Sequence, residues 1–427
     1  MGVYRTATWL FLLLTLATAG CHRYLVATPN LLQGRNPHGV YEECAADCRT
    51  PEAPIIYATD REIAATVNAQ PRYGSARAGQ LAFGLAQVNL GPDTTWQELI
   101  RDSTLTKRAR EHEVRVTSVR ELGVLKPSLD PAERDPRTKL ATLRSMEEDT
   151  QKEQLHKLLR ARLEQTAQKD VYIFVHGFNN TFDDAVFRAA EVWHFMGRVG
   201  IPVAYTWPAG HGGIRGYAYD RESGEFTVSH LRRFIKLVAE CPDVERIHLV
   251  AHSRGVDVTI SALRELHIAC HAQSKSTQQE LKLENLVLAA PDIDEEVFMQ
   301  RFVGEGMLSA AKRTTIYVSE HDKAIELSDV VFASRRRLGM LASKDFSPKM
   351  RRTLARMPNV HFVECKVSGI LMSHSYVFTH PAALSDLILL LRDYRDPGVA
   401  DGRPLRRTAE GIWELSDDYL AFRDKRR

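Results

Sequence analysis

The sequence has no excess of charge of one sign: 57 basic and 54 acidic residues leave a formal net charge of +3 over 427 residues. This balance gives no reason to expect a nucleic-acid partner. Cysteine is scarce, with six residues. No histidine pair accompanies Cys44 and Cys48, the closest two, so no metal site is expected. The chain also lacks a repeat of fixed period and, beyond Cys21, an apolar run able to cross a bilayer. The length of the chain and its 44% hydrophobic residues are sufficient for a large core.

The one long apolar run stands at the start of the chain. Arg5 precedes an apolar stretch from Trp9 to Leu16, and small residues follow, so residues 1–20 are predicted to be a secretory signal peptide. The end of this segment, Ala19-Gly20-Cys21, resembles the lipobox of bacterial lipoproteins, although Thr18 stands where leucine is usual. Two interpretations are open. Either Cys21 carries lipid and holds the protein to a membrane of the cell envelope, on its periplasmic face, or the signal is simply cleaved and the protein is secreted.

The rest of the chain divides into a linker, a domain and a tail. Residues 21–54, rich in proline, asparagine and glycine, are interpreted as a tether, in which an oxidising compartment would permit a Cys44–Cys48 bridge. Residues 55–395 are predicted to form one domain, and residues 396–427 a charged, loosely packed tail. Within the domain, residues 55–170 supply strands and a helix over 146–169, and residues 171–395 form its core.

Strand and helix patterns alternate through that core. Val171–Val175 is a continuous apolar run, which favours a strand buried on both faces. A helix is expected to begin near Thr181, which can form a capping box with Asp184. Because this alternation requires crossover connections, the predicted fold class is α/β, with a mostly parallel central sheet and helices on both faces.

A serine lies at one of these strand-to-helix junctions. The five residues Ala251-His252-Ser253-Arg254-Gly255 match the pattern G-x-S-x-G, with alanine in place of the first glycine. In such a turn the serine is held in strained geometry and projects into a cleft as a nucleophile. The alternative interpretation is that Ser253 only caps the following helix.

A nucleophilic serine needs donors for the oxyanion that forms when it attacks. The "HGFNN" stretch follows the strand at 171–175 and precedes a helix, where main-chain amides point outward. The amide of Phe178, supported by His176 and Gly177 in the same loop, is the first candidate donor. The amide of Arg254, next to the serine, is the second.

The serine also needs a base and an acid, which follow it in the chain in the order acid, then histidine. Asp322 follows a later strand and is preferred as the acid, with Asp292 as the alternative; Asp292 can instead cap a helix near Glu295. His374 lies after the last strand and is preferred as the base. His380 precedes a proline at the head of the final helix, which favours a capping role.

Together these residues give the chain a family likeness. It resembles the α/β-hydrolases, and more closely the bacterial esterase/lipase-like group called DUF900. The pieces that carry the resemblance are "IIYATDRE", "YGSARAGQLAFGLAQVNL", "VYIFVHGFNNTFDDAVFRAA", "AYTWPA", "HLVAHSRG", "LAAPDID", "YVSEHDKA" and "SHSYVF". The resemblance implies an α/β-hydrolase fold, no cofactor, and Ser253, Asp322 and His374 as nucleophile, orienting acid and base.

Three functions are compatible with these observations. The first is a carboxylic ester hydrolase that acts on a small acyl ester through an acyl-enzyme. The second is an amidase or peptidase that uses the same residues. The third is a lipoprotein that keeps the fold as a binding or scaffold module of the envelope, since a fold alone does not give a function.

Overall fold

The computed structural model describes residues 24–127, 135, 137–322, 337–346, 348–369 and 374–420. The signal segment and Cys21 therefore lie outside the described residues. The strands are β1 (Glu52–Val67), β2 (Gln70–Asn89), β3 (Arg115–Leu125), β4 (Asp170–Val175), β5 (Ile201–Thr206), β6 (Arg246–His252), β7 (Leu283–Ala289), β8 (Arg313–Val318), β9 (Val360–Lys366), β10 (Arg406–Arg407) and β11 (Trp413–Ser416).

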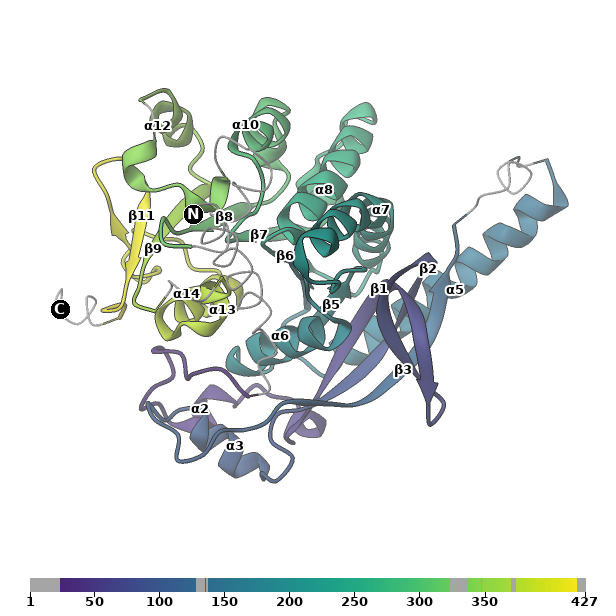
Figure 1. Cartoon of the computed structure of the whole chain (residues 1–427), viewed down its shortest axis with the longest axis horizontal. Coiled ribbons are helices and arrows are strands. Elements are labelled where there is room, and N and C mark those ends of the chain that lie inside the picture. The colour runs from purple at the N-terminus through teal and green to yellow at the C-terminus, as the bar shows by residue number, and fades with distance from the viewer. Residues whose placement is uncertain are drawn as a thin grey trace, which may run out of the picture.

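The helices cover both faces of the strands (Figure 1). They are α2 (Pro37–Val40), α3 (Trp96–Asp102), α5 (Lys139–Leu163), α6 (Phe182–Phe195), α7 (Gly213–Ala239), α8 (Gly255–Ala272), α9 (Thr277–Glu280), α10 (Glu295–Phe298), α12 (Pro348–Ala355), α13 (Tyr376–Thr379) and α14 (Pro381–Leu391). Short 3₁₀ or π-helical turns cover Ala46–Cys48, Met299–Gly304, Met307–Ser309, Leu338–Met340 and Ser343–Asp345. None of the described helices is long and apolar enough to span a membrane.

The described strands form one sheet, in the order β10-β11-β9-β8-β7-β6-β4-β5-β1-β2-β3. Neighbours from β11 to β1 run parallel. Antiparallel pairs occur only at the two ends of this sheet: β10 with β11, β1 with β2, and β2 with β3. The prediction of a mostly parallel sheet with helices on both faces is confirmed.

Alternate residues of the central strands face two separate cores. On one face, Phe174 and Val250 pack with residues of α6 and α14. On the other face, Ile173 and Leu249 pack with residues of α5, α7 and α8. Both faces are thus apolar, which explains why these strands appear in the sequence as unbroken hydrophobic runs. The parallel arrangement brings the carboxyl ends of β4, β6, β8 and their neighbours to one edge.

Helix boundaries follow local signals where caps are present. The predicted capping box is confirmed: Thr181 Oγ1 accepts a hydrogen bond from Asp184 N at 3.2 Å, and the Asp184 carboxylate accepts from Thr181 N at 2.8 Å. The helix predicted over residues 146–169 is α5, which begins and ends earlier than expected. Its first turns extend beyond the body of the protein (Figure 1).

The segment interpreted as a linker is packed against the domain in residues 24–54. Leu25 and Val26 are buried, and their main-chain amides donate to His112 O at 2.8 Å and to a Glu191 carboxylate oxygen at 3.0 Å. Cys44 and Cys48 are also buried, and they are not bonded to each other. The expectation of a loose tether is therefore wrong for these residues, because their apolar side chains complete the core beside α6.

The expectation of a loosely packed C-terminal tail is also wrong up to residue 420. β11 pairs in parallel with β9 and extends the sheet. Arg403 is fully buried and pairs with the Asp386 carboxylate at 2.8 Å. The charge of this segment does not indicate solvent exposure, because Arg403 is buried against Asp386 of α14.

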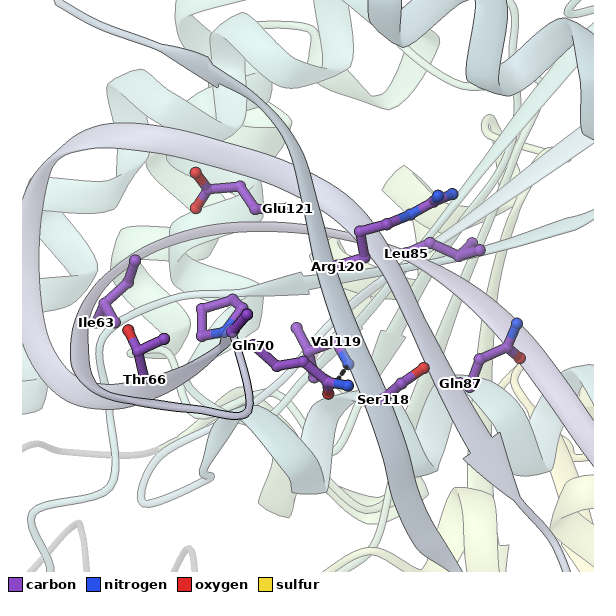
Figure 2. Close-up of a pocket in the computed structure, with 11 residues that line it drawn as sticks. Ile63, Thr66, Gln70, Leu85, Gln87, Ser118, Val119, Arg120 and Glu121 are labelled. Atoms are coloured by element: carbon purple, nitrogen blue, oxygen red, sulfur yellow. Dashed lines mark hydrogen bonds between the residues drawn. The ribbon is translucent and has the colours of Figure 1, made fainter.

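At the opposite edge, β1 and β2 form a long hairpin whose register shifts between Thr59 and Ala65. Such irregularities bend strands. The hairpin turn reaches back over the sheet, where Gln70 accepts a hydrogen bond from Val119 N at 3.0 Å (Figure 2). The curved hairpin borders an open pocket of about 640 Å³, which is lined by residues of β1, β2 and β3 and of the hairpin turn. β5 and β4 separate β1 from β6 in the sheet, so this pocket is not part of the site at the end of β6.

Candidate active site

Ser253 occupies the turn between β6 and α8. Its φ is +52°, in the left-handed region that non-glycine residues adopt only under strain. Its side chain does not cap α8: Arg254 is the residue before the helix, and no side-chain capping hydrogen bond is present there. The capping interpretation is thus not supported, whereas a strained serine at a strand-to-helix turn is typical of a nucleophile.

The turn is tight, and two glycines make it possible. A Cβ atom on Gly177 would lie 2.6 Å from Ser253 Cβ. A Cβ atom on Gly255 would lie 2.3 Å from His176 O. Real Cβ atoms do not approach other atoms so closely. The "HGFNN" loop therefore packs directly against the serine turn.

The two predicted oxyanion donors flank this contact. Neither the main-chain N–H of Phe178 nor that of Arg254 has a hydrogen-bond acceptor among the described residues. The Phe178 ring packs against Tyr217 of α7, with ring centroids 4.8 Å apart. Main-chain amides that have no acceptor among the described residues are available to donate hydrogen bonds to a developing oxyanion.

Asp322 and His374 are brought together although 52 residues separate them. His374 Nδ1 lies 2.7 Å from Asp322 Oδ2. The Asp322 side chain is only 1% exposed, and that of His374 is 23% exposed. Burial lowers the pKa of His374, but the Asp322 charge and hydrogen bond outweigh it, so this pKa is raised above its ordinary value. With Nδ1 facing the carboxylate, Nε2 is the nitrogen left for chemistry.

His252 links this pair to the serine turn. Its Nε2 lies 3.2 Å from His374 O, and the two rings are 4.8 Å apart. Burial, followed by the neighbouring His374, holds the pKa of His252 well below its ordinary value, so His252 is neutral and donates its Nε2–H to that carbonyl. Because Ser253 is the next residue in the chain, His374 lies near the serine turn.

The Ser253 hydroxyl itself forms no hydrogen bond with any described residue, and so none with His374. Hydrogen bonds of catalytic groups are often long without substrate and tighten when it binds. The arrangement thus consists of a formed Asp322–His374 pair and a serine turn in contact with it through His252.

The alternative residues have other partners. Asp292 is buried and accepts a hydrogen bond from the Tyr217 hydroxyl at 2.6 Å, and Arg337 lies 3.4 Å from it. It does not cap the helix after it, since Asp294 does so. His380 caps α14 by accepting from Ala382 N at 3.3 Å. Among the described residues, the acid bonded to His374 is Asp322.

The Arg254 side chain is buried and paired with a carboxylate. It is 9% exposed and forms an ion pair with Asp257 in the first turn of α8 at 2.9 Å. Burial lowers its pKa, but the charges of Asp257 and Asp292 outweigh this and raise it. The residue next to Ser253 is therefore a buried, paired cation.

Two residues near the oxyanion loop were not found from the sequence. Arg61 in β1 donates to Asn180 O at 2.7 Å, and Asp220 in α7 accepts from Asn179 N at 3.0 Å. Arg61 lies in one of the pieces that carry the family resemblance, and its signal is a charged pair, Asp60-Arg61, at the end of the buried run of β1. Asp220 has no comparable signal, because it is one of many charged residues in a long helix.

The helix-flanked parallel sheet, with a strained serine where a central strand meets a helix, defines an α/β-hydrolase. A comparison with family models agrees with this class. The chain belongs to the family described as alpha/beta hydrolase of unknown function (DUF900), whose model matches residues 151–392. A search of curated proteins finds no match. The family supports a hydrolase in general and names no substrate.

Proposed function

We propose that the protein is a serine hydrolase that cleaves carboxylic esters, with Ser253 as nucleophile, His374 as base and Asp322 as the acid that orients the base. The observation that carries the proposal is the 2.7 Å hydrogen bond between His374 and Asp322, beside a serine with positive φ. The serine needs such a base because a hydroxyl is a weak nucleophile until its proton is removed.

In this mechanism His374 Nε2 takes the Ser253 proton as the hydroxyl attacks the acyl carbon. The oxyanion accepts hydrogen bonds from the amides of Phe178 and Arg254. His374 then gives its proton to the leaving alcohol, and an acyl-enzyme remains. Water, activated by the same imidazole, attacks the acyl-enzyme and releases the acid. Asp322 holds the imidazole in the required tautomer and stabilises its charged form throughout.

A labelling experiment tests the nucleophile. The purified protein is treated with a fluorescent fluorophosphonate and assayed with short p-nitrophenyl esters. We expect labelling and hydrolysis in the wild type and in Ser309→Ala, an exposed serine on the protein surface. We expect neither in Ser253→Ala. Labelling of Ser253→Ala at the wild-type rate would place the nucleophile elsewhere.

The same assay separates the alternatives. Esters and amides with the same acyl group are compared in parallel, and we expect a higher kcat/KM for the esters. A higher value for amides would favour the amidase or peptidase. A folded wild-type protein without labelling or turnover would favour a binding or scaffold protein.

We also propose that the chain is exported and lipid-anchored at Cys21. The support is the apolar run followed by Ala19-Gly20-Cys21. Expression in a bacterium with radiolabelled palmitate tests it: label is expected in the wild type and not in Cys21→Ala. An unlabelled wild-type protein of the cleaved length in the medium would indicate a plain secretory signal.

A further inference from the structure

Arg61 is a buried arginine that connects several segments around the oxyanion loop. It is 2% exposed and lies near the carboxyl end of the sheet, in β1. Its Nε donates to Thr206 Oγ1 at 2.7 Å. Its Nη1 donates to Gly74 O at 2.9 Å and to Ala209 O at 2.7 Å. One guanidinium thus joins β1 to the hairpin and to the end of β5.

The remaining nitrogen of this guanidinium holds the oxyanion loop. Arg61 Nη2 donates to Asn180 O at 2.7 Å and lies 3.2 Å from His176 Nε2. His176 Nε2 also accepts from Trp207 N at 3.0 Å, which leaves the ring proton on Nδ1. His176 Nδ1 in turn donates to Gly177 O at 2.8 Å. Burial and the Arg61 charge keep the pKa of His176 well below its ordinary value, so the ring stays neutral and this pattern is stable.

Asp220 holds the same loop from the opposite side. It is buried in α7, and its Oδ2 accepts from Asn179 N at 3.0 Å and from Gly210 N at 3.3 Å. The groups on either side of Phe178 are therefore fixed: Gly177 O by His176, Asn179 N by Asp220, and Asn180 O by Arg61. Among the described residues, the Phe178 amide has no acceptor. A donor already held in place before the charge develops is what gives an oxyanion hole its effect.

Holding the loop in this way requires burial of the Arg61 charge, which is unfavourable. All its hydrogen-bond acceptors in the described residues are neutral, and burial lowers the pKa of Arg61 to about 10. The nearby Asp60 and Asp220 oppose that shift without bonding to it. Only a planar, five-donor guanidinium can bond to acceptors on this many segments at once, and lysine cannot replace it.

We propose that Arg61, together with Asp220, is a positioning residue that fixes the Phe178 amide in the oxyanion hole. This inference rests on the proposed serine hydrolase function. Arg61 acts through the loop and does not touch the substrate. Its loss should therefore lower kcat and leave KM and the His374 titration unchanged.

The central variant is Arg61→Lys, and Arg198→Lys is its matched control. Arg198 is also buried and donates to main-chain oxygens of Cys48, Thr50 and Glu52, away from the oxyanion loop. We expect Arg61→Lys to lower kcat for a p-nitrophenyl ester by about 10²–10³, the range seen when one oxyanion donor is lost. KM should stay within about threefold of wild type. The acid limb of the pH–rate profile should not move. Arg198→Lys should keep the wild-type kcat.

Asp220→Ala provides a second variant, so the idea stays testable if Arg61→Lys does not fold. It should also lower kcat at constant KM. A kcat within threefold of wild type in the folded variants overturns the proposal. So does an equal loss in Arg198→Lys, or a loss that appears only in KM.

Hydrogen–deuterium exchange keeps this test separate from the proposed function. Amides of residues 176–180 should exchange faster in Arg61→Lys and at the wild-type rate in Arg198→Lys. If the wild type shows no hydrolase activity but this exchange pattern appears, the proposed serine hydrolase function is refuted. The inference that Arg61 holds the loop in place is then still supported. If exchange in Arg61→Lys is unchanged, the inference that Arg61 holds the loop in place is refuted, whatever the activity.

Discussion

Replacing Asp322 by asparagine is the sharpest test of the acid assignment. The change removes the carboxylate charge and keeps the side-chain shape. The carboxylate oxygen lies 2.7 Å from His374 Nδ1 and is almost fully buried. At an effective dielectric constant of about 20, two unit charges at this distance attract by roughly 6 kcal/mol, which bounds the contribution to the imidazolium formed in the transition state. His374 is partly exposed, so we expect about 4–5.5 kcal/mol, or a 10³–10⁴-fold loss of kcat.

The assay is p-nitrophenyl ester hydrolysis as a function of pH. His374 must be neutral to accept a proton, and its pKa is raised in the wild type. Activity should therefore fall as pH is lowered, with an inflection above 6.5, the ordinary value for histidine. Asp322→Asn removes the main cause of the raised pKa of His374, and burial disfavours the charged imidazole. The inflection should therefore move to lower pH.

Asp292→Asn is the comparison, because Asp292 bonds to Tyr217 rather than to His374. We expect it to change kcat by less than about tenfold, since its charge raises the pKa of His374 only from a distance. A loss of less than tenfold in Asp322→Asn, or a greater loss in Asp292→Asn, would refute the assignment and favour Asp292 as the acid.

Three further outcomes are expected. Gly177→Ala should lower kcat/KM more than 100-fold because its Cβ would overlap Ser253, the proposed nucleophile. Gly39→Ala, where a Cβ meets open space, should not lower it, and equal values for the two variants would contradict the importance of the tight turn. Arg403→Met should lower the free energy of unfolding by about 3–5 kcal/mol because the buried Asp386 loses its cationic partner. Urea unfolding should show that the double variant with Asp386→Leu recovers part of this loss. Burial raises the pKa of Cys44 to about 11, so iodoacetamide at pH 8 should modify it only after unfolding. A disulfide at Cys44 found by mass spectrometry would contradict this expectation.

The central fold could be predicted from sequence because its signals are local. Unbroken apolar runs mark strands buried on both faces, as in Val171–Val175 and the run before Ser253. The alternation with helices then requires parallel neighbours. The pattern around Ser253 and the acid-then-histidine order also named the candidate site residues. Local patterns were enough to predict this part of the fold, whereas the roles of the three site residues remain a prediction.

The two ends of the described chain could not be predicted in the same way. Leu25 and Val26 lie among turn-forming residues, and no periodicity shows that they belong to the core. β11 is only four residues long and gains its stability from pairing with β9, about 50 residues earlier. Composition was misleading here because a few apolar contacts and one buried ion pair decide the structure of these segments.

The candidate site shows the same limit at finer scale. Sequence can name a serine, an acid and a histidine, but the direction of their side chains depends on residues that carry no chemical signature. His252 is an example: its ring meets His374 only because β6 delivers it to the same edge, and its Nε2–H then fixes a carbonyl of the histidine segment. Arg61 is another, since its acceptors come from segments up to 148 residues away. The positions of the supporting residues are properties of the assembled sheet, and the reactivity proposed for Ser253 depends on them as much as on the serine itself.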